Sequence, residues 1–377
     1  MDIKEFRAGI HVQQNKYKSF RPRKINKEWT WTDPKINTLL SEANQKLGEL
    51  NAFSLSVPDV DMFIRMHVAK EARTSSRIEG TRTEIVDALK VEKDIDPEAR
   101  DDWNEVQNYI EAMNGSILAL EKLPLSSRLL KLAHKRLMRG VRGKDKQPGK
   151  YRNSQNWIGG ATKQDATYIP PMHTEINDLM SDIENFMHNN TIDVPHLIKI
   201  AIIHYQFETI HPFLDGNGRL GRLFIALYLV SSGRLSKPTL YLSDYLEKNK
   251  KLYFDNMSLV RESNNLAQWI KFFLVGIIET SKAGIFTFEK ILKLKESIEG
   301  ERIVNLGKKV PNAKKLANYL YKKPFISVSE VSNILGVAPT TANSLIQDFI
   351  NLKILREFPG IKRNRRFTFH EYIELFV

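Results

Sequence analysis

The sequence predicts a mainly α-helical fold with one β-hairpin insert and a small C-terminal unit. Apolar residues recur at helical spacing through most of residues 34–300. One interruption, residues 140–171, is rich in glycine and proline and contains short β-prone stretches, which predict a loop carrying a hairpin. The end of the chain combines three short helical patterns with two strand-like stretches, so we expect it to fold separately.

Most of the chain is predicted to be helical, apart from its basic start. Residues 1–33 have few periodic apolar positions, and we expect them to form an arm laid over the protein surface. Helical spacing predicts helices at residues 36–53, 60–78, 106–123, 173–188, 194–207, 223–233, 245–260 and 267–280. The hairpin insert lies between the third and fourth of these helices.

The composition limits the functions open to this chain. It has 377 residues and a formal net charge of +13. The length suits two or three domains, which we place at residues 1–110, 111–300 and 308–377. The positive charge favours an acidic ligand or partner, such as a nucleotide, nucleic acid or an acidic protein.

The absence of cysteine also bears on the cell compartment. A chain with no cysteine forms no disulfide, thiolate zinc site or cysteine nucleophile, and it fits a reducing cytosol. No stretch has the pattern of a signal peptide or is apolar for long enough to span a bilayer. We therefore predict a cytoplasmic protein with no membrane partner.

The C-terminal unit has the element order of a winged helix-turn-helix. Its three helical patterns lie at residues 312–323, 327–336 and 339–354, and a basic turn joins the two strand-like stretches within 355–371. The DNA contacts would then be Thr340, Thr341, Asn343, Lys362, Arg363, Arg365 and Arg366. The alternative is that this unit packs against its own chain or a second copy, with its charges solvated.

The string HPFLDGNGRLGR, residues 211–222, carries chemistry that packing does not require. Its GNGRLG portion matches the dinucleotide-binding pattern G-x-G-x-x-G, which needs a preceding β-strand. The preceding residues have helical spacing instead, so we reject that interpretation. The sequence also lacks the G-x-x-x-x-G-K-[ST] pattern of a P-loop.

The remaining geometry is a helix, a short loop and a second helix that the glycines open. Backbone N–H groups of Gly216, Asn217 and Gly218 at the start of that helix would form an anion cradle. Arg219 and Arg222 lie three residues apart and share a helix face, so their guanidinium groups could bind adjacent phosphates. The pattern predicts a polyphosphate site.

Two further residues of the string suit phosphoryl chemistry. Asp215 precedes the cradle and is the kind of hard oxygen ligand with which Mg²⁺ supplements substrate phosphates. His211 ends the preceding helix, near where a substrate hydroxyl would lose its proton. Histidine has a pKa suited to a general base near neutral pH.

The twelve-residue string resembles the signature of the Fic family, His-x-Phe-x-Asp/Glu-Gly-Asn-Gly-Arg-x-x-Arg, at every fixed position. The resemblance implies a Fic-type helical core and transfer of AMP from ATP to a hydroxyl side chain (Ser, Thr or Tyr) of a target protein. It assigns the general base to His211, the Mg²⁺ ligand to Asp215 and a buried anchor to Phe213. It also assigns the α- and β-phosphates to Gly216, Asn217 and Gly218, and the β- and γ-phosphates to Arg219 and Arg222.

The resemblance extends beyond the signature. Residues 149–171 resemble the family's flap, a hairpin that pairs with a segment of the target protein. Our candidates for the pairing edge are Ile158, Gly159, Gly160 and Ala161, although an ordinary surface hairpin is the alternative. The C-terminal core helices resemble those whose side chains approach the adenine, which points to Tyr253 and Arg261. The alternative for Tyr253 is a core position.

The segment TSSRIEGT, residues 74–81, resembles an inhibitory motif of the family, Ser/Thr-x-x-x-Glu-Gly/Asn. Its fixed positions are Ser75, Glu79 and Gly80. Glu79 could pair with Arg222, which would remove the arginine meant for the γ-phosphate and add negative charge where ATP carries its own. The alternative is an exposed glutamate at a helix end.

Three functions follow as hypotheses. The first is a protein adenylyltransferase that Glu79 inhibits, with an unidentified target protein. The second keeps the fold but removes AMP or transfers another phosphate-containing group. The third is a DNA-binding regulator that acts through the C-terminal unit. A homodimer is left open.

Overall fold

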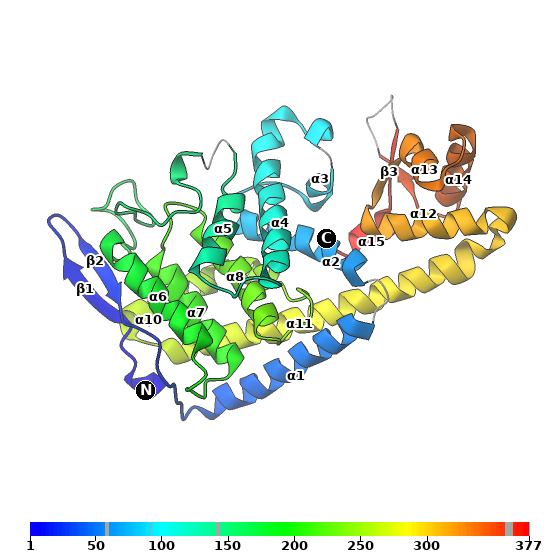
Figure 1. Cartoon of the computed structure of the whole chain (residues 1–377). Coiled ribbons are helices and arrows are strands. Elements are labelled where there is room, and N and C mark those ends of the chain that lie inside the picture. The colour runs from blue at the N-terminus through cyan, green and yellow to red at the C-terminus, as the bar shows by residue number, and fades with distance from the viewer. Residues whose placement is uncertain (57–59, 91, 141–143, 359–364, 377) are drawn as a thin grey trace.

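The computed structural model describes residues 1–56, 60–90, 92–140, 144–358 and 365–376. The fold is mainly helical, as predicted, with short strands at the N-terminus and in the C-terminal unit (Figure 1). Among the described residues, no helix is both long and apolar enough to cross a membrane.

The core consists of helices packed around two that are buried on nearly every side. These two are α7 (His196–Ile210) and α8 (Asn217–Ser231). Residues 211–216 between them form the loop of the Fic-like signature, which we call the signature loop. A helix that is apolar all round must lie inside a protein, which places the loop at the centre of the fold. The surrounding helices are α4 (Arg100–Leu120), α5 (Ser127–Leu137), α6 (Ile176–His188), α9 (Ser243–Lys248) and α10 (Lys250–Ser263).

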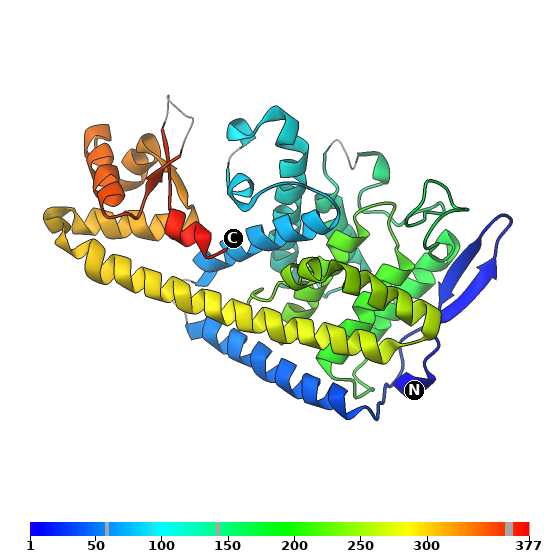
Figure 2. The same ribbon diagram turned by 180° about the vertical axis from the view of Figure 1, so that it is seen from behind.

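Two long helices connect the parts of the molecule. α1 (Pro34–Ser56) lies alongside α11 (Leu266–Ser297), which runs from the core to the C-terminal unit (Figures 1 and 2). α2 (Val60–Ile78) carries the predicted inhibitory motif at its C-terminal end and packs against α4 and α9. The short helix α3 (Ile85–Ala88) follows it.

The N-terminal arm differs from its prediction. Residues 1–33 contain an antiparallel hairpin of β1 (Gly9–Gln13) and β2 (Lys18–Pro22). Phe20 is buried, and its N–H donates to the Ile169 carbonyl at 2.8 Å, so the hairpin packs beside the predicted flap. We predicted an arm laid over the protein surface and identified no strands in it, because only one face of this hairpin is buried and its apolar positions are few.

The flap contains less β-structure than the predicted hairpin. Ile158 and Tyr168 form a single antiparallel bridge, with N–H to carbonyl distances of 2.8 and 3.1 Å, and no longer strand continues it among the described residues of the insert. Gly159 and Gly160 adopt left-handed φ angles of 70° and 71°, which end the extended conformation. Asp165 then accepts the N–H groups of Ala161 and Thr162, closing a compact turn.

The C-terminal unit contains the three predicted helices and the two predicted strands. They are α12 (Val310–Lys322), α13 (Val328–Leu335), α14 (Pro339–Asn351), β4 (Arg356–Glu357) and β5 (Arg366–Thr368). A further strand, β3 (Phe325–Ser327), completes a sheet of order β3-β5-β4, and α15 (His370–Glu374) ends the chain. We missed both because they are only three and five residues long. Lys362 and Arg363 lie outside the described residues.

One predicted DNA contact is committed to another role. Arg366 is largely buried, and its guanidinium lies 3.0 Å from the Asp94 carboxylate and 3.6 Å from that of Glu330. It therefore joins the C-terminal unit to the segment that follows α3. Arg365 is exposed, and so are Thr340 and Thr341 at the start of α14, whereas Asn343 is half-buried within 3.5 Å of Arg365.

Candidate active site

Two residues in the left-handed conformation delimit the signature loop. His211 has φ 50° and caps α7, with its N–H donating to the Phe207 carbonyl at 2.9 Å. Gly216 has φ 75° and caps the start of α8. A side chain at Gly216 would be strained by this angle and would also collide with the Met138 sulfur, so glycine is required here. The N-terminus of α8 is thereby open to an anion.

The Asn217 side chain supports the loop. Its Oδ1 accepts the N–H of Phe213 and its Nδ2 donates to the carbonyl of the same residue, both at 2.9 Å. Phe213 is fully buried, as the resemblance implied, and stacks on the His134 ring with centroids 3.9 Å apart. Asn217 can therefore serve an anion through its backbone N–H, while its side chain fixes the shape of the loop.

His134 on α5 is a supporting residue that the sequence did not reveal. The N–H of Gly149 donates to its Nδ1 at 2.8 Å, so Nε2 carries the proton and donates to the Asp215 carbonyl at 2.9 Å. Burial lowers the pKa of His134 to about 4, which keeps the ring neutral and this arrangement intact at neutral pH. A single histidine in an amphipathic helix gives no signal of such a role.

His211 is half-buried at the loop, and its Nδ1 is enclosed with no hydrogen-bond partner among the described residues, so the neutral ring has a nitrogen that could accept a proton. Burial lowers the pKa of His211 to about 4, and the positive charge of Arg152 acts in the same direction. Arg152 is itself buried and donates to the carbonyls of His211, Ser154 and Pro171 at 3.0, 3.1 and 2.6 Å. This arginine ties both ends of the flap to the loop, a role missed because its partners are backbone atoms.

Arg222 forms the contact expected from the sequence. Its Nη2 lies 2.6 Å from Glu79 Oε1 and 2.9 Å from the Ser75 carbonyl, and its Nε donates to Ser75 Oγ at 2.9 Å. The Arg222 side chain is 1% exposed, whereas that of Glu79 is 40% exposed. Burial would raise the pKa of Glu79, but the charge of Arg222 outweighs it and holds that pKa below its usual value.

Gly218 makes room for this ion pair. A Cβ at Gly218 would overlap Glu79 Oε1 and lie 3.1 Å from an Arg222 nitrogen. The glycine therefore has two consequences, since it frees the start of α8 for a phosphate and also admits the Glu79 carboxylate to the same place. An anionic ligand and Glu79 would compete for this position.

Arg219 is held by a second carboxylate. Its Nη1 lies 3.3 Å from Glu105 Oε2 on α4, and the same carboxylate oxygen accepts the Thr81 hydroxyl at 2.8 Å. Arg219 Nη2 is 3.9 Å from Asp215 Oδ1. Glu105 was missed because nothing in its own segment distinguishes it from an ordinary surface glutamate. Both arginines of the signature are therefore paired with carboxylates from the N-terminal region.

Glu208 is a buried acid one turn before His211. Burial raises the pKa of Glu208 to about 7, and Arg222 only partly offsets this effect. A Cβ at Gly221 would overlap its carboxyl group, so this glycine creates the space that Glu208 occupies. The folded protein therefore retains a proton on Glu208 that the unfolded chain would release at a lower pH.

This proton should be visible in the pH dependence of stability. Because the folded pKa lies above the unfolded one, the stabilisation is complete below about pH 4.5 and is lost as the pH rises through about 7. We expect Glu208→Gln to remove up to about 3 kcal/mol of this loss, measured as the difference in unfolding free energy between pH 5 and pH 8. The exposed Glu111→Gln is the control, and an equal pH dependence in both variants would contradict the prediction.

The predicted adenine contacts differ in accessibility. Tyr253 is 2% exposed, and its hydroxyl lies 3.0 Å from His204 Nε2 inside the core, so a base cannot stack on it in this conformation. Arg261 lies with its guanidinium 4.2 Å from the centre of the Tyr168 ring and is only partly buried. Of the two, Arg261 is therefore the one placed to reach a ligand.

The predicted flap edge requires a similar correction. Both backbone groups of Ile158 bond to Tyr168, so they are not available to a target segment. The backbone groups of Trp157, which precedes the bridge, point the other way, as they do along an extended chain. On the other side, the left-handed φ of Gly159 ends the extended conformation. Gly159, Gly160 and Ala161 are exposed, as are the side chains of Trp157 and Ile158. The N–H of Ala161 is engaged by Asp165, and Gly159 and Gly160 are not extended, which leaves Trp157 as the better candidate for pairing.

The fold and the site together define a helical protein with a glycine-rich loop whose two arginines pair with carboxylates of the N-terminal region. Residues 37–117 match the model of the Fic/DOC family N-terminal region, and residues 124–229 match that of the Fic/DOC family itself. The chain belongs to the Fic family.

Curated relatives support a Fic-type transferase. The chain is 29% identical over 149 residues to Protein adenylyltransferase Fic of Drosophila erecta, covering 38% of this chain and 28% of that protein. It is 26% identical over 221 residues to the protein of the same name from Aedes aegypti, covering 55% and 41%. A probable protein adenylyltransferase of Aquifex aeolicus is 41% identical over 90 residues, covering 24% and 26%. The chain thus spans less than half the length of these relatives.

Solved structures share the fold. A Fic family protein from Desulfovibrio desulfuricans superposes with a TM-score of 0.57 at 19% identity, covering 90% of this chain and 96% of that one. Fic-1 from C. elegans superposes with a TM-score of 0.53 at 19% identity, covering 70% and 75%. At these identities the likeness concerns the fold alone.

Proposed function

We propose that this protein is an adenylyltransferase that transfers AMP from ATP to a hydroxyl side chain of a target protein and that Glu79 holds it inactive. The observation that carries the proposal is the 2.6 Å ion pair between Glu79 and Arg222, placed where the signature loop would bind phosphate. Relatives named protein adenylyltransferase support ATP as the substrate. The direct test is transfer of label from the α-phosphate of ATP, and not from the γ-phosphate.

The residues of the loop would divide the reaction between them. The hydroxyl oxygen of the target forms a bond to the α-phosphorus, the bond from that phosphorus to the bridging oxygen breaks, and pyrophosphate leaves. His211 accepts the hydroxyl proton, for which its neutral ring is suited. The backbone N–H groups at the start of α8 stabilise the phosphate charge, and Arg219 and Arg222 bind the outer phosphates once their carboxylate partners have moved.

Asp215 fits a Mg²⁺ ligand by its position and exposure. Its carboxylate is half-exposed at the mouth of the loop, and one oxygen accepts the N–H of Gly216 at 2.6 Å. A single carboxylate beside a phosphate site is the setting in which Mg²⁺ binds mainly through substrate oxygens. When bound there, the ion would neutralise part of the phosphate charge.

The pH dependence of transfer should report on the base. Because His211 must be unprotonated and burial lowers its pKa to about 4, the rate should stay constant from about pH 7 to 5 and fall only below that. We would measure initial rates of the Glu79→Gly variant across this range, with unfolding followed in parallel. A midpoint near 6.5, the usual histidine value, would contradict the lowered pKa of His211, and a rate that does not fall at all on acidification would contradict its role as the base.

Glu105 should act as a second restraint on ATP. Replacing it by glutamine removes the charge that holds Arg219 but preserves the size of the side chain. We expect ATP to bind roughly tenfold more tightly, since about 1 to 2 kcal/mol of ion pairing no longer has to be broken. Titration calorimetry would measure this affinity. The matched control is Glu111→Gln. Glu111 lies on the same helix as Glu105 and is an exposed partner of Arg139, so this substitution should leave the affinity for ATP unchanged.

A second candidate function is DNA binding by the C-terminal unit. It is favoured by the exposed Thr340 and Thr341 at the start of α14, the helix that would enter the major groove. Retardation of duplex DNA across a salt series tests it, because neutralised phosphates make affinity fall steeply with salt. Absence of retardation at low salt would remove this candidate.

A further inference from the structure

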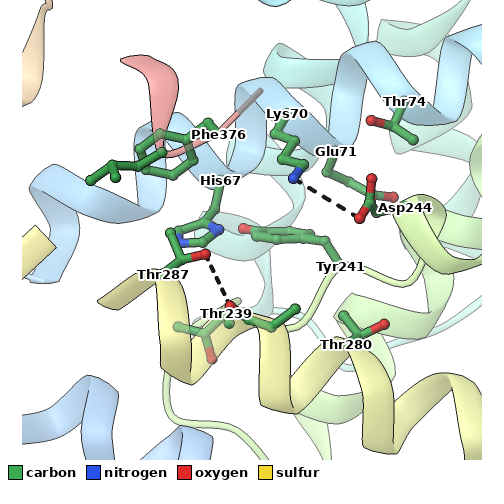
Figure 3. Close-up of a pocket in the computed structure, with 13 residues that line it drawn as sticks. His67, Lys70, Glu71, Thr74, Thr239, Tyr241, Asp244, Thr280, Thr287 and Phe376 are labelled. Carbon is green, nitrogen blue, oxygen red and sulfur yellow. Dashed lines mark hydrogen bonds and ion pairs between the residues drawn. The ribbon is translucent and has the colours of Figure 1, made fainter. Parts of the chain in front are cut away.

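A cavity that no part of the proposed reaction uses lies against the helix that carries Glu79. It has a volume of about 60 Å³ and is formed by α2, α11 and the segment that leads into α9 (Figure 3). Phe376 closes one side (Figure 3). No residue of the signature loop is among those that line it. The cavity is thus separate from the phosphate site but shares a helix with its inhibitory residue.

Several buried polar groups around this cavity lack a protein partner. His67 Nε2, Thr74 Oγ1 and Tyr241 Oη have no hydrogen bond to any described residue, although these residues are only 8%, 1% and 8% exposed. Thr280 Oγ1 is a fourth such atom. Buried polar groups are almost always satisfied in native proteins, so these four atoms require water or a small ligand in the cavity as their partner.

The chemistry of these groups defines the occupant. Hydroxyls can donate or accept, and burial keeps His67 neutral by lowering its pKa to about 3, so its Nε2 can serve as either a donor or an acceptor according to the tautomer. The only ammonium of the lining, Lys70, lies 4.0 Å from the Asp244 carboxylate, which offsets its charge. A neutral molecule bearing hydroxyl groups suits this environment better than an ion.

The size and the walls of the cavity narrow the class further. A water molecule needs roughly 10 to 15 Å³ of such volume, so the cavity has room for about four waters or a molecule of comparable size. The rings of Tyr241 and Phe376 lie 6.3 and 5.0 Å from that of His67, and they offer apolar faces to C–H groups. A short chain of hydroxylated carbons satisfies both the polar atoms and the aromatic walls.

We propose that this cavity is a binding site for a small neutral polyol, with glycerol and erythritol as its representatives, and that occupancy stabilises α2 in its inhibitory position. Thr74 directly precedes Ser75, whose hydroxyl and carbonyl hold Arg222. Glu71, also in the lining, accepts the Tyr109 hydroxyl at 3.0 Å and so joins the cavity to α4. A ligand that binds one position of α2 better than another shifts the helix toward it.

Binding is tested by ligand-observed NMR titration of the full chain with glycerol and erythritol. We expect saturable binding of erythritol, and 1-butanol, with the same carbon chain but one hydroxyl, should compete poorly. Thr74→Val and Tyr241→Phe remove a hydroxyl with little change of shape and should each weaken binding about tenfold. Thr83→Val is the matched control, since Thr83 Oγ1 is also buried without a partner among described residues but lies outside the cavity.

The outcomes separate the site from its effect. Absence of saturable binding by either polyol would show that the cavity holds ordered water only and would overturn the proposal. If Thr74→Val and Tyr241→Phe bind the polyols as tightly as the wild type does, any binding occurs outside this cavity. That outcome would also overturn the proposal. Thermal unfolding of each variant verifies that it is folded.

The action on α2 rests on the proposed function and needs its own measurement. Saturating erythritol should weaken ATP binding to the wild type several-fold and leave the Glu79→Gly variant unaffected, because that variant has no carboxylate to hold Arg222. Polyol binding without a change in ATP affinity would overturn the action on α2. A failure of the proposed function would show separately, as an absence of AMP transfer by Glu79→Gly.

Discussion

Replacing Glu79 by glycine is expected to raise the transfer of AMP from α-labelled ATP, to the protein itself or to a supplied target, by roughly thirtyfold. The wild type must break the 2.6 Å contact with Arg222 before the γ-phosphate can take its place. Removing a close charge partner of this kind changes binding by about 2 kcal/mol or more, which corresponds to roughly thirtyfold in rate. The measurement is label incorporation per unit time at a subsaturating ATP concentration.

A matched control separates release of Arg222 from a general loosening of the region. Glu84 lies five residues further on and pairs with Arg73 at 3.1 Å, and its own side chain is exposed. Glu84→Gly should leave the rate of transfer at the wild-type level. Transfer of label from γ-labelled ATP by either variant would contradict the adenylyl interpretation. Release of label from a protein that already carries AMP would favour the alternative function, in which AMP is removed.

Replacing His211 by alanine should lower transfer by about 10²- to 10⁴-fold while ATP binding stays nearly intact. The base acts on the incoming hydroxyl, and the His211 side chain has no phosphate to hold. Its carbonyl still accepts Arg152, so the loop should keep its shape. The double variant Glu79→Gly/His211→Ala, compared with Glu79→Gly alone, gives the cleanest reading of both the rate and the ATP affinity.

If the His211→Ala variant loses both ATP binding and AMP transfer, His211 shapes the loop and does not act as the base. The control substitution is His11→Ala, at an exposed histidine of the N-terminal hairpin. It should alter neither quantity. Retention of full activity by the His211 variant would remove the histidine from the mechanism altogether.

The sequence anticipated the parts of the site that are contiguous in the chain. One stretch of twelve residues contains the loop, both helix ends and both arginines, so their roles could be read from their order. The pair of Glu79 and Arg222 was expected only because a second short motif resembled a known inhibitory one. The structure confirms that contact, with Ser75 as an additional partner of the arginine.

Errors arose where neighbouring residues decided the conformation. The flap was expected to be a hairpin, but left-handed Gly159 and Gly160 reduce it to one bridge. Tyr253 was a candidate for the adenine contact, with a core position as the alternative, and its burial against His204 fits the core position. Arg366 was one of the candidate DNA contacts, and its pairing with Asp94 fits the alternative, in which the C-terminal unit packs against its own chain. Each depends on which surfaces meet after folding.

The sequence by itself determined the helical class, the glycine-rich loop between two helices and the type of each group in it, because helix periodicity and loop chemistry are local properties. Only the tertiary structure showed that Glu105 restrains Arg219, that His134 and Arg152 fix the loop, and that a polar cavity adjoins α2. The contacts from Arg152 to His211, from His134 to Asp215 and from Glu105 to Arg219 join residues that are 59, 81 and 114 positions apart. Charges and hydrogen-bonding groups so far apart become partners only when the packing of the helices brings them together.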